Sequence, residues 1–402
     1  MGRILGEEVA GALSCYDLRM DPILTLGAFG SVCLLCGSLQ VPLVESSAIH
    51  LGGAFVYSTV TRKVDGASGV PPAISFPGES ADTTPHGAAI SLSWQTPAPK
   101  GQGVGTPAFE VTGGVVEAIS HTESNSKDTS GQVAANGSGN GRFESFYGVV
   151  RVPLGLCHSL EAGVEVPFNR SRDLTVSGVG NLYFTPGRRD LYSFTTNVAL
   201  GYRFRGRGWE ASAAGLYSTT STQNGTGYAY SNGSGTLWGG EAQILRQFGK
   251  LGASLAAGAQ AGHLTFTEGL YPDFVETRYE SPLKRRFVRA EVAYPVSTVS
   301  LRFSALWLHV EAPYWDAGAT LNVETLLHDG GLDFSTRSNE VLLRLTAEIP
   351  LRKTVMLQLT ALVRQGSETV DFTATSVNPG SASLSLTRSG WAAIGGFRAA
   401  VP

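Results

Sequence analysis

The segment LEAGVEVPF, residues 160–168, indicates the fold most directly, because its apolar residues alternate with charged or small ones. Side chains along a β-strand point to opposite faces in turn, so every second residue shares a face. One face of this segment is apolar from Leu160 to Phe168, and the other carries Glu161 and Glu165. A strand of this kind separates an apolar environment from a polar one.

The same alternation recurs in residues 197–204, 341–349 and 355–364. Each segment has one apolar face, while the other face mixes small residues with polar or charged ones. The apolar faces comprise Val198, Leu200, Tyr202 and Phe204, then Val341, Leu343, Leu345, Ala347 and Ile349, then Val355, Leu357, Leu359, Ala361 and Val363. After residue 49 this two-residue period, rather than the 3.6-residue period of helices, is the repeated pattern. The pattern predicts an all-β fold.

The connections between these segments alternate in length. Short turns close strands at residues 152–154, 294–296 and 349–351, each with a central proline, and at 205–208 and 248–251 through glycine. Proline suits a strand end, where no N–H is needed for the sheet. A sixth short turn is expected near residues 97–106. The long polar stretches are 61–86, 122–142, 169–192, 220–234, 267–285, 311–330 and 366–388.

Regular alternation of short turns with long loops is typical of an antiparallel barrel in an outer membrane, with short periplasmic turns and long extracellular loops. A strand can cross lipid only in a closed sheet, because every backbone donor and acceptor must be paired within the protein. We therefore predict a transmembrane antiparallel up-and-down β-barrel of about 14 strands, within a range of 12–16. Sixteen strands result if Leu182–Phe184 adds a strand pair. The alternative is a soluble β-sandwich or β-helix, which gives no reason for the alternating lengths.

Composition agrees with a barrel and excludes other classes. The chain has 402 residues, of which 50 are glycine and only 16% are charged, against about 25% charged in an average soluble domain. Glycine at this frequency disfavours long helices. The formal net charge of -3 disfavours disorder, and 30 Lys+Arg against 33 Asp+Glu gives no basic footprint for nucleic acid.

The first 48 residues are expected to be a leader that is removed. Residues 22–37 are apolar but too short for a membrane helix, with Arg19 before them and the small residues 46–48 after them. This is typical of a secretory signal peptide cleaved after Ala48, and Met20 is a plausible start. The predicted organisation is a leader over 1–48 and an outer-membrane barrel over 49–402. The alternative for residues 22–37 is a buried core helix.

Cysteine usage is consistent with export. Cys33 and Cys36 form a C-x-x-C pair inside the expected leader, and Cys157 is the one cysteine after residue 48. Neither an internal disulfide nor a thiolate zinc cage can form from one cysteine. A lipid anchor at Cys36 is the alternative, although the preceding residues 33–35 do not fit its pattern.

No enzymatic constellation stands out, and we expect neither an enzyme nor a cofactor. The sequence has no G-x-S-x-G, H-E-x-x-H or phosphate-binding loop. A barrel hydrolase would need a histidine facing one site with a serine or carboxylate. His263 or His309 with Glu161 or Glu165 is the combination left open for that alternative.

The polar faces of the strands are the candidate functional surface. If the apolar faces meet lipid, the polar faces point into the barrel lumen. The candidate lining residues are Glu161, Glu165, Asn197, Arg203, Arg289, Glu291, Arg302, Arg344, Glu348, Gln358 and Arg364. They form either a selectivity lining for a small solute or a structural lattice of ion pairs.

Three segments carry a family resemblance: FYGVVR at 146–151, LEAGVEVPF at 160–168 and GVGNL at 178–182. They resemble the outer-membrane transporter family named after the meta-pathway of phenol degradation (MetA-type). Asn181 stands where that family usually has aspartate. The resemblance implies a barrel that passes small molecules, hydrophobic ones among them, and carries over no catalytic residues. Such barrels commonly end in an aromatic residue, whereas here five residues follow Phe397.

The sequence therefore predicts a passive outer-membrane channel or transporter for small solutes, located in the cell outer membrane. The expected partners are outer-membrane lipid, periplasmic chaperones, the barrel-assembly machinery and an unidentified small solute, with no nucleic acid among them. The alternative is a structural or surface-interaction barrel that acts through its long extracellular loops. A barrel hydrolase is the third and least favoured interpretation.

Overall fold

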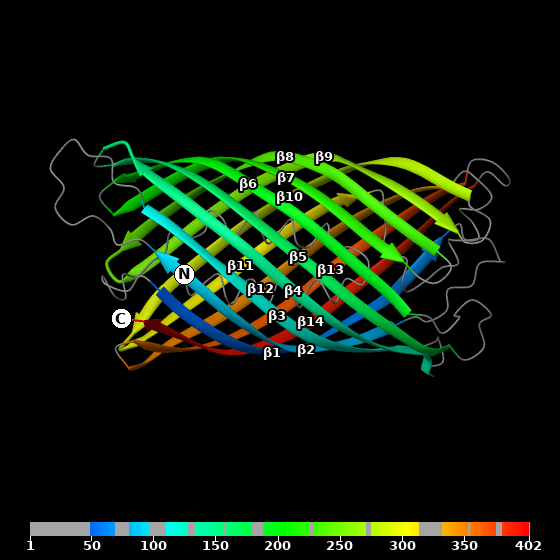
Figure 1. Cartoon of the computed structure of the whole chain (residues 1–402), viewed down its shortest axis with the longest axis horizontal. Helices are drawn as coiled ribbons and strands as arrows, with labels where there is room; N and C mark the ends of the chain where they lie inside the picture. The colour runs from blue at the N-terminus through cyan, green and yellow to red at the C-terminus, as the bar shows by residue number, and fades with distance from the viewer. Residues whose placement is uncertain are drawn as a thin grey trace.

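Fourteen antiparallel strands form a closed barrel in the computed structural model of the chain (Figure 1). The structure describes residues 49–68, 80–95, 110–127, 133–155, 157–178, 188–206, 208–225, 229–270, 275–312, 332–352, 354–374 and 380–401. Within these residues no helix is long and apolar enough to cross a membrane. The expected leader, residues 1–48, lies outside them.

The strands follow one another around the wall in chain order. They are β1 Ile49–Ser68, β2 Ser80–Gln95, β3 Glu110–Lys127, β4 Val133–Pro153, β5 His158–Gly178, β6 Arg188–Gly206, β7 Trp209–Gly225, β8 Ala229–Phe248, β9 Leu251–Leu270, β10 Val275–Val296, β11 Val299–Ala312, β12 Leu332–Arg352, β13 Val355–Ala374 and β14 Gly380–Val401. Each pairs with its neighbours in sequence, and β1 closes the barrel against β14 from Ile49↔Val401 to Ser68↔Ser383.

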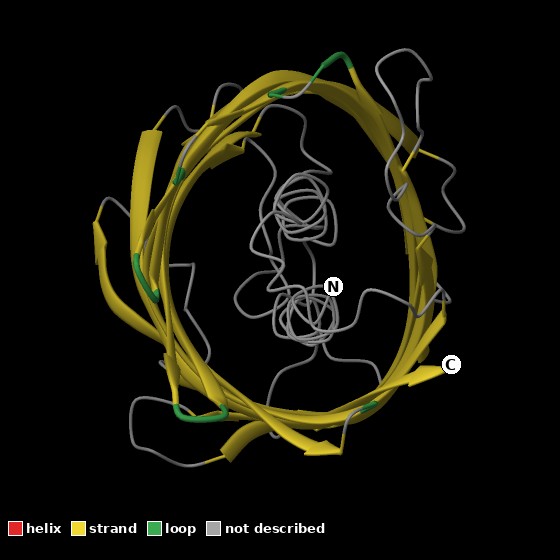
Figure 2. Cartoon of the chain, turned by 90° about the vertical axis from the view of Figure 1, so that its left-hand side faces the viewer, coloured by secondary structure: helices red, strands yellow, loops and turns green. Residues whose placement is uncertain are grey.

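The strand number and closure confirm the predicted fold class. A sixteen-strand barrel is wrong, because β5 and β6 pair directly with each other in the sheet. Leu182–Phe184, which would have added the extra pair, lies outside the described residues. The cross-section is oval, with the strands inclined to the long axis (Figures 1 and 2).

Most strands extend beyond the residues that show the predicted alternation. Most of the long loops are therefore shorter than expected. For example, β3 reaches Lys127 and β4 begins at Val133, where a loop over 122–142 was predicted. These outer segments are rich in Ser, Thr, Gly, Asn and charged residues. Backbone hydrogen bonds continue the sheet there although the alternation of apolar and polar residues weakens, so the sequence pattern ends before the strand does.

Five short connections occur close to the predicted positions, but the proline segments 294–296 and 349–351 lie at the ends of β10 and β12, and the turns follow them. The sixth, near 97–106, is outside the described residues. Gly208 and Gly249 have positive φ angles of 75° and 59° at the β6–β7 and β8–β9 turns. Glycine adopts these angles without the steric penalty of a Cβ. Ser297 has a φ angle of 56° at the β10–β11 turn. All these turns lie at one end of the barrel, which we call the short-turn end; the other is the long-connection end (Figure 1).

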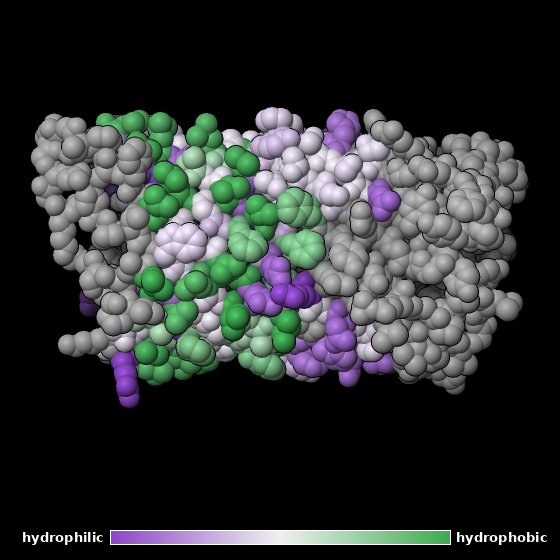
Figure 3. Space-filling view, in the orientation of Figure 1, coloured by the Kyte–Doolittle hydropathy of each residue, from purple (hydrophilic) through white to green (hydrophobic). Residues whose placement is uncertain are grey.

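The outer surface carries an apolar belt, most of it in the half of the barrel nearer the short-turn end (Figure 3). Exposed apolar side chains recur at every second residue, as in β6 with Val198, Leu200 and Tyr202. Trp238, Trp307 and Trp391 are exposed on the same face. The belt gives the fold an outer surface suited to lipid, so the barrel is transmembrane.

The inner face holds both the buried apolar residues and most of the buried charges. Val56, Val116, Leu237 and Leu283 are at most 1% exposed and occupy inward positions on β1, β3, β8 and β10. The barrel interior is therefore a mixed apolar and ionic layer.

Candidate lumen lining

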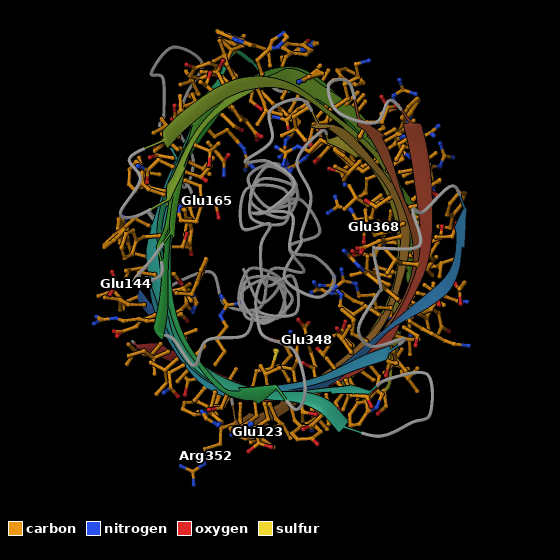
Figure 4. The ribbon with its side chains drawn as sticks, turned by 90° about the vertical axis from the view of Figure 1, so that its right-hand side faces the viewer. Glu123, Glu144, Glu165, Glu348, Arg352 and Glu368 are labelled. Carbon is orange, nitrogen blue, oxygen red and sulfur yellow. The ribbon has the colours of Figure 1, made fainter. Side chains whose placement is uncertain are left out.

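All eleven candidate lining residues occupy positions on the inner face of the wall. The strand registers place them opposite one another or two residues apart on that face, and the apolar belt occupies the alternate positions. Figure 4 shows Glu165 and Glu348 pointing into the barrel, whereas Glu144 and Arg352 point outward. The structure joins some of these residues directly and others through partners that the sequence did not suggest.

One ionic network crosses four adjacent strands near the short-turn end. We call it the first ladder, and it consists of Arg151, Glu161, Arg203, Glu210 and Arg205 from β4, β5, β6, β7 and β6. Arg203 donates to the Glu161 carboxylate at 2.8 Å and to the Glu210 carboxylate at 2.7 Å. Arg151 pairs with the other Glu161 oxygen, and Arg205 donates to Glu210 at 2.9 Å. Cations and carboxylates alternate along this network.

The Arg203 guanidinium is the centre of the first ladder. Its side chain is 4% exposed and it contacts both carboxylates, while Arg205 at the edge is 63% exposed. The tight β6–β7 turn explains how Arg203 and Glu210 meet, because the hairpin pairs Arg205 with Glu210 across it. Charge-assisted hydrogen bonds of this kind are the stronger class, and they also fix geometry.

A second network lies on the last three strands of the chain, β12, β13 and β14. We call it the second ladder, formed by Glu340, Arg364, Arg388 and Glu368. The Glu340 carboxylate accepts hydrogen bonds from Arg364 at 2.5 Å and from Arg388 at 3.4 Å. Arg388 also pairs with Glu368, which points into the barrel (Figure 4). All four side chains are at most 9% exposed.

Other candidate residues meet neutral or single partners. Glu165 accepts hydrogen bonds from Asn197 at 3.2 Å and from Ser145 at 3.5 Å. Arg302 on β11 donates to Glu348 on β12 at 3.0 Å, and Gln358 lies directly opposite Glu348 on β13. Arg344 shares the inner face of β12 with them.

Arg289 and Glu291 belong to a buried polar region on β8, β9 and β10. Glu241 on β8 interacts electrostatically with Arg289. Arg285, four residues before Arg289 on the same face, donates to Gln260 at 2.6 Å. Ser218 on β7 accepts from Gln260 at 3.5 Å, so the region extends across four strands.

Apolar side chains lie beside this region on the inner face of β10, β11 and β12, and the Phe287 ring lies over Gly258 of β9. Phe287 lies opposite Leu308, and Leu306 lies opposite Leu342. Phe287, Leu308 and Leu342 are at most 6% exposed. Because Arg285 and Arg289 flank Phe287 on the same face of β10, charged and apolar side chains alternate along this part of the wall.

Sequence analysis did not identify several members of these networks, among them Glu210, Arg285, Glu340, Glu368 and Arg388. Arg285, Glu368 and Arg388 fall in stretches that were expected to be loops. The usable signal was the two-residue period: Arg285, Glu340 and Glu368 each lie four residues from a predicted inward residue of the same strand, namely Arg289, Arg344 and Arg364. Extending the two-residue count beyond the apolar segment would have found most of them.

The hydrolase combination is not assembled. His263 lies on the outer face of β9, opposite Thr236 of β8. His309 lies on the outer face of β11, where its ring stacks on Trp307. Glu161 and Glu165 point to the inner face. The wall separates the histidines from these carboxylates, so the combinations proposed for a catalytic site do not exist. Among the described residues no group of three metal-ligating side chains is gathered.

Comparison with known proteins supports the barrel fold but identifies no family. No protein-family model matches the chain, and no curated protein matches it. The resemblance to the MetA-type family therefore stays a prediction.

Several solved structures are similar in shape. One is the deltaS2 mutant of TodX, a monoaromatic hydrocarbon channel, with 11% identity over 89% of this chain and 91% of that one and a TM-score of 0.50; wild-type TodX is from Pseudomonas putida. A FadL homologue from Pseudomonas aeruginosa matches with 10% identity over 88% and 90% and a TM-score of 0.45. At 11% identity, the likeness to the TodX mutant shows a common barrel architecture alone.

Proposed function

We propose that this protein is a passive channel for small solutes in the cell outer membrane. The observation that carries the proposal is the division of the wall into an apolar outer belt and an inner face bearing charges of both signs. Rings or ladders of charged side chains on a lumen wall are a general basis for selecting small solutes. Closed antiparallel barrels with short turns at one end are typical of outer membranes.

The solute class in this proposal is small molecules with an apolar or aromatic body and a polar group. The support is the alternation of apolar and cationic side chains on the inner face, where Phe287 lies between Arg285 and Arg289 and Leu342 lies opposite Arg364. A face of this composition suits a solute with an apolar ring and a polar substituent. The monoaromatic hydrocarbons transported by TodX belong to the apolar end of this class.

The proposal includes partners that export and assembly require. These are outer-membrane lipid around the belt, periplasmic chaperones and the barrel-assembly machinery. Phe397 on β14 is 54% exposed on the outer face, where an assembly factor can contact it. The four residues after it, Arg398 to Val401, continue β14 and pair with β1.

The decisive experiment is conductance and flux of the folded, membrane-extracted protein. We expect discrete conductance steps in planar bilayers and entry of small aromatic acids into proteoliposomes. Arg364→Gln, which removes an inner-face charge, should change the anion-to-cation permeability ratio. Arg246→Gln, which removes an exposed outer-face charge at the short-turn end, should leave that ratio unchanged. Folded protein that gives neither steps nor flux would refute the channel.

The loop-based alternative needs a narrower test than the sequence suggested. Residues 122–142 and 366–388 are largely strand, so removing them would damage the wall. Replacing only 128–132 and 375–379 with short glycine turns leaves the described strands intact. A channel should keep its conductance after this change, whereas a protein acting through those connections should lose partner binding.

A further inference from the structure

Exposed charges lie on the outer face just beyond the apolar belt, toward the long-connection end. One group lies on β3 and β4, and another lies on β10 to β13. Lys63 and Asp65 are also exposed on the outer face of β1. The β3–β4 and β10–β13 sectors differ in their balance of charge.

The β3–β4 sector is internally compensated. Arg142 pairs with Glu117 at 3.0 Å and with Glu144 at 2.5 Å. One cation is thus shared by two carboxylates, and the sector has no positive charge left over for a ligand.

The β10–β13 sector has the opposite balance. Its cations are Lys284, Arg286 and Arg337, and its carboxylates are Glu311 and Asp371. Arg337 is paired with Asp371 at 2.7 Å. Lys284 lies 3.7 Å from Glu311, whose other oxygen is 3.2 Å from the His309 ring. Within the described part of the chain, Arg286 lies in no ion pair, and it interacts electrostatically with Glu311 at longer range.

Lys284 and Arg286 have the placement of a lipid-headgroup site. They are two residues apart on the outer face of β10, and both are exposed. Ala261 and Ala259 lie beside them on β9, so no large side chain covers them from that strand. Val288 follows on the same face and belongs to the belt, and Trp307 lies opposite it on β11. A ligand held there would have its charged group at the two cations and its apolar part against the belt.

We propose that Lys284 and Arg286 bind a phosphate group of the phosphorylated glycolipid in the outer leaflet of the outer membrane. The inference rests on the outer-membrane location proposed above. Guanidinium groups bind phosphate in a forked geometry, and an ammonium adds a compact charge. A basic residue near an anionic membrane surface contributes about a fivefold factor in affinity. Acyl chains of the same lipid lie along Val288 and Trp307.

The test uses the full, folded protein in detergent and bis-phosphorylated lipid A as the probe, with binding followed by native mass spectrometry. The double variant Lys284→Gln/Arg286→Gln should bind lipid A about 30-fold more weakly than wild type. The matched control is Arg246→Gln/Arg352→Gln, which removes two exposed cations at the short-turn end. The control should bind as wild type does.

Three further measurements make the outcome decisive. Dephosphorylated lipid A should bind wild type as weakly as it binds the double variant, and Arg286→Lys should retain most of the affinity. Inorganic phosphate should compete only weakly, because it lacks the acyl chains. Equal losses in both double variants, or no preference for the phosphorylated lipid, would overturn the site. Unchanged conductance of Lys284→Gln/Arg286→Gln would keep that failure separate from any failure of the channel.

Discussion

The two faces of one strand have opposite environments. On β5, Leu160 is 41% exposed on the outer face, whereas its neighbour Glu161 is 3% exposed on the inner face and lies between two arginines. On β6, Leu200 is 66% exposed and Arg203 is 4% exposed. In this protein apolar side chains are on the outside and charges are enclosed. The effect of a substitution therefore depends on the face that the residue occupies, since the same chemical change has opposite effects on the two sides.

The largest effect is expected from breaking the first ladder at its centre. Arg203→Ala removes the cation shared by Glu161 and Glu210, leaving each carboxylate with one partner in a buried setting. Removing one member of a buried ion pair costs about 3–5 kcal/mol. Denaturant unfolding in detergent, followed by heat-modifiable gel migration, should show a loss of about 3 kcal/mol.

The matched control for this prediction is Arg246→Ala on the outer face, where the side chain is exposed over the Phe248 ring. Its effect should be below about 1 kcal/mol. Equal losses for the two variants would contradict the comparison between the faces.

The converse change places a charge in the outer belt. Leu200→Arg puts a guanidinium where lipid is expected, and charged residues at the bilayer midplane of a barrel cost about 2–4 kcal/mol. Ser389→Arg on the outer face of β14, beyond the belt, should cost about 0–1 kcal/mol. Unfolding measurements in lipid vesicles distinguish the two. If Leu200→Arg were harmless, the belt would not be the lipid-facing surface.

A smaller effect tests packing instead of charge. A Cβ added at Gly262, on the inner face of β9, would overlap the Thr236 carbonyl oxygen of β8. Gly262→Ala should therefore destabilise the barrel by about 1–3 kcal/mol. At Gly395, on the outer face of β14, the nearest atom is a Leu359 methyl carbon at 3.9 Å. Gly395→Ala should be neutral or slightly stabilising, and a loss there equal to that of Gly262→Ala would go against this account.

Much of the architecture could be predicted because it depends on local features. The strand count followed from turn residues such as Gly249 and Pro295 and from the two-residue period of segments such as 160–168. The inner and outer faces of β5, β6, β12 and β13 follow from the same period, because neighbouring side chains of a strand must point to opposite sides.

The ionic networks could be predicted only in part, because their members are far apart in the chain. Glu161 and Arg203 are 42 residues apart, and Glu340 and Arg388 are 48 residues apart. Their contact requires the register between strands, which depends on connections that carry no periodic signal. The true strand lengths were missed for a related reason, since beyond the belt backbone pairing alone maintains the sheet.

The apolar side of each central strand and the number of strands in the wall could be predicted from the sequence alone. Both properties are carried by neighbouring residues and need no long-range contact. The contacts between charges, such as those of Arg203 with Glu161 and Glu210, depend on the tertiary structure, and so does the position of Arg286 outside any ion pair among the described residues. Pairing of this kind is set by the closure and register of the barrel, because hydrogen bonding between whole strands brings distant side chains to the same level.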